Sequence, residues 1–352
     1  MAFLNRMRRM FAGAAKPAPP AAAPPLGPAS RNAGAAPAGF TPAASGPGCS
    51  AAAESTDDAP PACPTDLDRR FSAFMLAIAQ CRPGAAEPPE RSVLQRLEAL
   101  GHDAADVERL PRLPSVLPRL MRLARRDDVA PRELVDHLSH DPALVGEVVR
   151  LANSPRYRTA RGIDNLQAAV IAIGQRGMNQ LVTSVAMRPI FNLPQGRFSR
   201  AAGTRLWALA ERGAHACAFL RGDAADGFNA YLAGLVANVG WIAALRVLDQ
   251  SELAVQGADT AGFHDELPLV AAGLSARIAR HWAFPAEVCQ ALDGRAVNAQ
   301  ATRADALGFA LRAADRVSKW HLLEPGIDAA RFGADPAIES RGYLELGRTF
   351  GA

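Results

Sequence analysis

Helical periodicity constrains this chain more than any other feature of its sequence. From about Thr65 onward, large apolar residues recur at intervals of three and four, which places them on one face of a helix. The first such set is Leu67, Phe71, Phe74, Met75 and Ile78. Segments of this kind follow one another to about residue 321, and the apolar/polar alternation typical of strands does not persist between them. The sequence therefore predicts an all-α fold.

Capping residues, prolines and glycines indicate where the helices begin and end. Two helices are predicted near residues 66–81 and 89–100. Later helical stretches are predicted over residues 165–173, 175–190, 201–220, 227–249, 267–282, 286–293 and 304–321. The apolar faces of these and neighbouring helices predict a core that includes Leu120, Leu134, Leu144, Val148, Leu151, Leu181, Leu232, Leu235, Ile242 and Ile278.

The composition changes along the chain and divides it into segments. Residues 12–64 are mostly Ala, Pro, Gly and Ser, with too few large side chains to form a core, so we predict a disordered Ala/Pro-rich tether. Residues 65–108 are expected to form a two-helix N-terminal extension and residues 109–321 the main helical domain. Residues 322–352 are expected to form a C-terminal tail with a short helix.

Residues 1–11 carry Phe, Leu and Met side chains on one helical face, with Arg6, Arg8 and Arg9 largely off that face. This pattern is typical of a short amphipathic helix that lies on a membrane surface or docks on a partner. A frayed terminus is the alternative, because isolated helices of this length are only marginally stable.

Composition and motif content exclude several protein classes. The five Cys are scattered and form no C-x-x-C pair, unlike a disulfide scaffold or a zinc ribbon. No apolar run reaches the roughly 18 residues of a membrane span, and the Arg residues near the start are unlike a secretory signal. A net charge of +4 is too small to indicate nucleic-acid binding. We therefore expect a cytoplasmic protein without a transmembrane segment.

Three His-Asp dipeptides are candidate metal ligands, because imidazole and carboxylate groups must converge on one cation to activate water. They are His102-Asp103, His140-Asp141 and His264-Asp265. Each falls in a predicted connector or at a helix N-cap, whereas a ligand pair is expected inside a buried helix that faces other helices. No metal site is predicted on any of the three.

The segment that begins at Asn153 has two interpretations. Asn153, Ser154 and Pro155 are typical of a helix end, because the residue before a proline disfavours the helical conformation. Alternatively, Asn153, Ser154, Arg156 and Arg158 form a partner-facing or anion-facing loop. Helix termination is the preferred interpretation, and the loop stays open as the second.

Several short motifs occur in one order along the chain. They are Leu-Pro-Arg-Leu-Pro at 110–114, Asp-Pro-Ala-Leu at 141–144, Arg-Leu-Ala-Asn-Ser at 150–154, Leu-Gln-Ala-Ala-Val-Ile-Ala-Ile-Gly at 166–174, Gly-Leu-Val-Ala-Asn-Val-Gly at 234–240 and Trp-Ala-Phe-Pro at 282–285. Together they resemble the HDOD domain, a bacterial signalling domain related to the HD phosphohydrolase superfamily. The resemblance covers roughly residues 109–320 and implies a multi-helix, HD-like fold.

The same resemblance implies where metal ligands of the HD superfamily would lie, and this chain departs from that set. Ala237 stands where the metal-binding His would be, and Asn238 stands where the adjacent Asp would be. The resemblance places further His positions at or near Leu209, Ala271, Arg295 and Ala296. Asp315 alone matches the ligand set, and it is expected to pair instead with an Arg of its own helix. The two candidates for that pair are Arg312 and Arg316.

Without a complete ligand set, no metal, cofactor or catalytic residue is expected. The resemblance implies a non-enzymatic regulatory or scaffold protein that acts through protein–protein interaction. Its partner would be another signalling protein, such as a sensor, a regulator or a cyclic-dinucleotide enzyme. Two alternatives stay open. One is a divergent HD-type metal-dependent phosphohydrolase acting on a nucleotide or cyclic dinucleotide, and the other is a membrane- or pole-localised adaptor addressed by residues 1–11.

Overall fold

The computed structural model of this protein describes most of the chain beyond residue 65. The described residues are 66–102, 110–115, 117–124, 142–153, 162–193, 196–223, 225–297, 305–327, 332 and 335–351. By its internal contacts the chain divides into Met1–Pro60 and Pro61–Ala352, and all described residues belong to the second unit. The amphipathic helix predicted at 1–11 and the tether predicted at 12–64 both lie outside the described residues.

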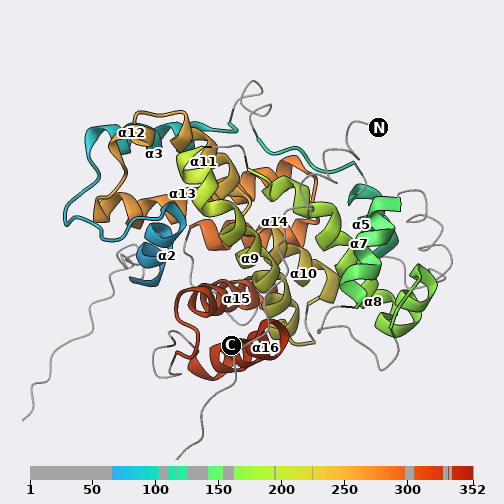
Figure 1. Ribbon diagram of the computed structural model, residues 1–352. Coiled ribbons are helices and arrows are strands. Elements are labelled where there is room, and N and C mark those ends of the chain that lie inside the picture. Colours follow the sequence, from blue (N-terminus) through green and yellow to red (C-terminus); the bar gives the residue numbers. More distant parts are fainter. Residues whose placement is uncertain are drawn as a thin grey trace, which may run out of the picture. The chain divides into compact units, whose positions relative to one another are not determined.

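The described part of the second unit is helical (Figure 1). Its first helices are α2 (Asp66–Leu76), α3 (Pro88–Ala99), α5 (Leu117–Ala124), α7 (Pro142–Ala152), α8 (Leu166–Met187) and the 3₁₀ helix η1 (Arg188–Phe191). They are followed by α9 (Arg197–Leu220), α10 (Gly227–Val236), α11 (Gly240–Asp249), α12 (Leu253–Gln256), α13 (Ala261–His281), α14 (Ala286–Ala296), α15 (Ala306–Leu323) and α16 (Pro336–Phe350). The described residues contain no strand, only an isolated bridge between Arg82 and Thr260, so the all-α prediction is confirmed.

Helix α9 organises the helices that matter for the candidate site. It packs most extensively against α10 and α15, and it also contacts α2, α11 and α16. The backbones of α9 and α10 meet at Gly213 and Gly234, where a Cβ on Gly234 would lie only 2.2 Å from the carbonyl oxygen of Gly213. Glycine is therefore required for this close approach. In Figure 1, α16 lies beside α15, against which it packs.

The predicted core is confirmed wherever its side chains are described. Val148, Leu181, Leu232, Leu235, Ile242 and Ile278 are all buried. Leu120, Leu134, Leu144 and Leu151 lie outside the described side chains. The break between the helices predicted at 165–173 and 175–190 is also confirmed, because Gly174 has φ 76° and interrupts α8. Such a left-handed conformation favours glycine.

Several helix predictions are wrong in their boundaries. The helix predicted near 66–81 ends at Leu76, and the helix predicted at 201–220 begins at Arg197. The predicted helix 227–249 is two helices, because a turn separates the end of α10 at Val236 from the start of α11 at Gly240. Helix α13 begins at Ala261 rather than at 267. Its earlier start follows from Thr260, whose side-chain oxygen accepts a hydrogen bond from the backbone N–H of Phe263 and so caps the helix. Pro268 is accommodated inside α13.

The segment Gly227–Asp249 is long and apolar enough to span a membrane by length and composition, but 89% of its apolar 18-residue window is buried inside the protein. It contains α10 and α11, which pack against α9 and other helices of the same unit. Its apolar character is therefore accounted for by its place in the core.

Candidate functional site

Three of the positions that the resemblance assigned to metal ligands, Asn238, Arg295 and Asp315, meet at the short turn between α10 and α11. Asn238 lies in that turn and is 2% exposed, and Asp315 lies in α15 and is 8% exposed. The side chain of Arg295, from the last turn of α14, reaches both of them. Three separate elements therefore contribute one group each to a buried polar site.

The guanidinium of Arg295 is the centre of this site. Its Nη1 donates to the backbone oxygen of Ala237 at 2.7 Å. Its Nη2 donates to Asn238 Oδ1 at 3.0 Å and to Asp315 Oδ1 at 2.9 Å. Asn238 Nδ2 in turn donates to the same carboxylate oxygen of Asp315 at 3.2 Å. The arginine thus ties the turn between α10 and α11 to α15.

The second oxygen of Asp315 binds a second cation. Lys319 Nζ lies 2.5 Å from Asp315 Oδ2 and 2.6 Å from Asp68 Oδ1, and the lysine side chain is 4% exposed. Asp68 belongs to α2, so the network continues into the N-terminal extension. The result is a chain of alternating charges in which each carboxylate contacts a cation: Asp68, Lys319, Asp315 and Arg295.

The two cations decide the protonation state of Asp315. Burial disfavours a charged carboxylate and on its own would raise its pKa. The charges of Arg295 and Lys319, with hydrogen bonds from Lys319 and Asn238, outweigh that effect and hold the pKa of Asp315 well below its usual value. Asp315 is therefore ionised at neutral pH, and both of its oxygens are engaged.

The sequence model of one known family matches this part of the chain. The HDOD domain model aligns with residues 110–295, just over half of the sequence. The chain belongs to the HDOD domain family. The turn between α10 and α11 and the residue Arg295 lie inside this match, whereas Asp315, Lys319 and α2 lie outside it.

Solved structures share the fold of this HDOD protein. An HDOD domain protein of unknown function from Geobacter sulfurreducens is 22% identical, with a TM-score of 0.52 over 74% of this chain and 88% of that one. A proposed metal-dependent phosphohydrolase from Shewanella amazonensis is 19% identical, with a TM-score of 0.53 over 75% of this chain and 91% of that one. A proposed signal transduction protein from Marinobacter aquaeolei is 20% identical, with a TM-score of 0.52 over 74% and 62% of the two chains. At such identities the likeness shows the fold alone.

A relative found by sequence is an uncharacterised protein of Treponema pallidum. It is 28% identical over 137 residues, which are 38% of this chain and 26% of that protein. This HDOD chain therefore spans only about a quarter of the relative's length.

A metal ion of the kind used by HD phosphohydrolases does not fit the residues of this HDOD site. The side chains of Leu209 and Ala237 have no lone pair to donate, and both residues are buried. The amide of Asn238 is a weaker ligand than a carboxylate, and Asp315 is already bound by two fixed cations. Among the described residues, no cluster of three or more His, Cys, Asp or Glu could hold a metal ion.

The expected pairing of Asp315 with Arg312 or Arg316 is wrong. Asp315 pairs with Arg295 and Lys319, while Arg316 Nε lies 2.9 Å from Glu339 Oε1 of α16. Lys319 could have been found in the sequence, because it follows Asp315 by one helical turn. Asp68 could not have been found, since no local pattern relates residues of α2 and α15.

The described residues of the three His-Asp dipeptides, His102, His264 and Asp265, do not contribute to this site. The prediction that His264-Asp265 lies in a connector is wrong, because both residues fall in the first turns of α13. His264 is fully buried, with Nδ1 2.7 Å from Ser72 Oγ and Nε2 3.0 Å from the backbone oxygen of Ala258. Asp265 accepts two hydrogen bonds from Arg69. His102 is exposed, whereas Asp103 and His140-Asp141 lie outside the described residues.

Asn153 has structural partners at the end of α7. Its side-chain oxygen accepts a hydrogen bond from the backbone N–H of Ile163 at 2.8 Å, and its Nδ2 donates to the backbone oxygens of Val149 and Ile163. These bonds agree with the helix-termination interpretation. Ser154, Arg156 and Arg158 lie outside the described residues, so the partner-facing loop stays a prediction.

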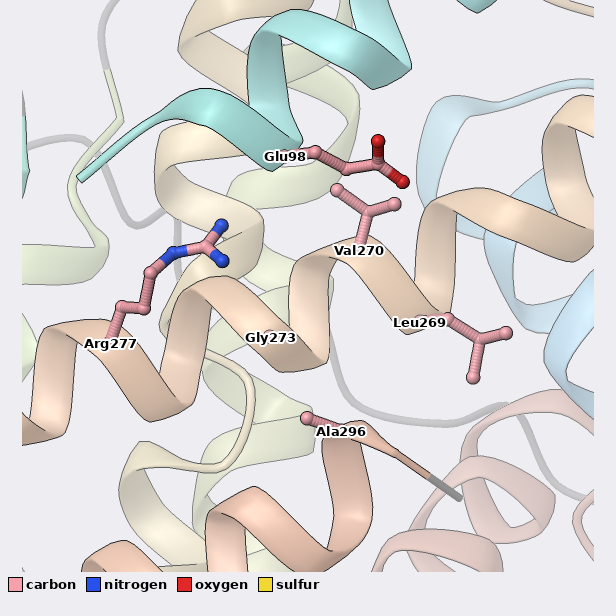
Figure 2. A pocket seen from close by; sticks show the side chains of 6 residues that line it. All are labelled: Glu98, Leu269, Val270, Gly273, Arg277 and Ala296. Carbon is pink, nitrogen blue, oxygen red and sulfur yellow. The ribbon is translucent and has the colours of Figure 1, made fainter. Parts of the chain in front are cut away.

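A surface hollow of about 240 Å³ lies elsewhere on the HDOD protein. Figure 2 shows Leu269, Val270, Gly273 and Arg277 along α13, with Glu98 of α3 on one side and Ala296 of α14 on the other. Small-molecule sites are typically about 300–1,000 Å³ and enclosed. This hollow is smaller and open, and it contains none of the charged residues of the buried network.

Proposed function

We propose that this HDOD protein is a non-enzymatic regulatory or scaffold protein of bacterial signal transduction, which acts through protein–protein interaction of its helical domain. The observation that supports this proposal is the state of Asp315. Both of its carboxylate oxygens are bound by side chains of the protein, Arg295 on one and Lys319 on the other. Hydrolysis by an activated water needs a metal ion with an open coordination position. Asp315 offers no free oxygen to bind such a metal ion, because side chains of the protein bind both of its oxygens.

The partner we propose is another signalling protein in the cytoplasm: a sensor, a regulator or a cyclic-dinucleotide enzyme. The membership of the HDOD family supports this class, as does the fold shared with a proposed signal transduction protein. The mild net charge of +4 argues against nucleic acid as the partner. Residues 1–11 are proposed to direct the protein to a membrane surface, to a cell pole or to a partner.

Affinity capture of the full chain from a lysate of its own bacterium tests the proposal. The wild-type protein should enrich a signalling protein reproducibly, as identified by mass spectrometry. A matched variant, Leu235→Asp, disrupts the core and should lose that capture. A second variant without residues 1–11 separates capture by the helical domain from capture or localisation by the N-terminus.

The alternative of a divergent phosphohydrolase is tested on the same protein preparation. The purified chain is incubated with a general phosphodiester substrate and with cyclic dinucleotides, in the presence of Mn²⁺. The proposal predicts no hydrolysis above the level of Asp315→Ala. Hydrolysis by the wild type that Asp315→Ala abolishes would overturn the proposal and establish an enzyme.

A further inference from the structure

Three oxygen atoms of different origin converge on the guanidinium of Arg295. They are the backbone oxygen of Ala237, the amide oxygen of Asn238 and a carboxylate oxygen of Asp315. Backbone carbonyl, side-chain amide and carboxylate oxygens are also the ligand types that hard divalent cations take in proteins. The oxygens around Arg295 therefore resemble the ligands of a metal site, with the guanidinium of Arg295 in the place of the metal ion.

The buried network contains two carboxylates and two cations, and Arg295 is one of the two cations. Asp68 and Asp315 contribute two negative charges, and Lys319 and Arg295 contribute two positive charges. Without Arg295, Asp315 keeps only Lys319, a cation that it shares with Asp68, and its side chain is 9% exposed. An uncompensated buried charge is strongly unfavourable. A positive charge at the position of the guanidinium therefore stabilises the buried carboxylate of Asp315.

We propose that Arg295 is the built-in occupant of an oxygen-lined cation site, and that it determines that no free metal ion binds there. A metal ion in this place would join the turn between α10 and α11 to α15. Arg295 makes the same connection from α14 through three hydrogen bonds. The inference goes beyond the proposed function, because it concerns the cation and not a partner, and it stands or falls independently of any captured protein.

A pair of matched variants tests this inference. Arg295→Ala removes the charge and leaves space, and Asn238→Asp adds a second carboxylate to the vacated site. We expect this double variant to bind one Mn²⁺ per chain and to show a melting temperature that rises with Mn²⁺ concentration. The control is Asn238→Asp with Arg295→Met, which carries the same charges but fills the space with an unbranched side chain.

The control should bind Mn²⁺ at least about tenfold more weakly than the alanine variant, a difference that calorimetry resolves easily. The wild type should show no saturable Mn²⁺ binding. Equal Mn²⁺ affinity in the alanine variant, the methionine variant and the wild type would overturn the inference.

Single substitutions keep the test decisive where the double variants do not fold. Arg295→Lys keeps the charge, and Arg295→Met removes it at similar length. We expect Arg295→Met to lower the melting temperature by about 5 °C or more, and Arg295→Lys to lower it less. A methionine variant that melts at or above the temperature of the lysine variant would show that no cation is needed at this position.

Discussion

Arg295 and Asp315 form a largely buried ion pair, with Nη2 2.9 Å from Oδ1 and side chains that are 10% and 9% exposed. The two residues come from α14 and α15, and the same arginine also holds the turn between α10 and α11. The pair therefore connects three elements of the helical domain at the positions that the sequence resemblance assigned to metal ligands. Its energetic consequences can be measured directly.

Asp315→Asn should destabilise the protein in a pH-dependent way. The pKa of Asp315 is lower in the folded protein than in the unfolded chain. At pH values between these two pKa values, the folded state therefore binds fewer protons than the unfolded state. The stabilisation is fully present above the unfolded pKa of about 4 and is lost as pH falls through the lower, folded pKa. We expect a loss of about 3–5 kcal/mol at pH 7, because two buried cations lose a partner. Thermal unfolding at pH 7 and pH 3 measures this, and an equal difference at both pH values would contradict it.

Lys319→Met should cost more than the loss of an exposed ion pair elsewhere in the protein. Lys319 is buried between Asp68 and Asp315, whereas Arg280 pairs with Asp293 at the surface. We expect a loss of about 2–4 kcal/mol for Lys319→Met and at most about 0.5 kcal/mol for Arg280→Met. Chemical denaturation of both variants gives the comparison. Similar losses in the two variants would show that the buried network contributes no more than a surface pair.

Leu235→Ala tests the assignment of the core face. Leu235 is fully buried in α10, so its truncation should lower the free energy of unfolding by about 2–5 kcal/mol. Leu344 of α16 is 62% exposed and serves as the matched control, with an expected change within about 0.5 kcal/mol. If both substitutions changed the melting temperature equally, the helical face would be assigned incorrectly.

Mild acid should weaken the contact between α16 and the rest of the protein. Arg212 Nε donates to His321 Nδ1 at 3.1 Å, so that nitrogen must be unprotonated, and the ring of His321 lies 5.4 Å from Tyr343 of α16. Burial first, and the charge of Arg212 second, lower the pKa of His321. A histidine with a lowered folded pKa stabilises the fold above its unfolded pKa of about 6.5 and loses this contribution as pH falls.

His321→Gln keeps an acceptor for Arg212 but cannot be protonated in this range. The wild type should therefore lose thermal stability between pH 7 and pH 5.5 by more than His321→Gln does. Hydrogen exchange of α16 over the same range localises the effect. An identical pH dependence of the two proteins would contradict the role of His321.

The fold and the site differ in how far the sequence predicts them. Helices follow from local periodicity, and the interruption of α8 follows from Gly174, whose backbone conformation favours glycine. The division between α10 and α11 was missed because the apolar pattern continues through Ala237 and Val239 without a proline. Here tertiary contacts override the local signal.

The network around Asp315 was predicted only in part. The resemblance located Asn238, Asp315 and the neighbourhood of Arg295, but periodicity gives no information on which side chains of different helices meet. A local pairing in α15 was the natural expectation, because residues three or four apart in a helix are neighbours. Arg295 and Asp68 come from other helices, and only the arrangement of α2, α14 and α15 brings them to the site.

Metal analysis of the purified wild-type protein tests the central claim most directly. The claim is that Asp315 is bound by protein cations and that the HDOD domain uses no metal ion. Inductively coupled plasma mass spectrometry of wild type and Asp315→Ala, purified without chelators, should find iron, manganese and zinc far below one atom per chain in both. One equivalent of such a metal in the wild type that is lost in Asp315→Ala would contradict the account and favour a metal-dependent phosphohydrolase.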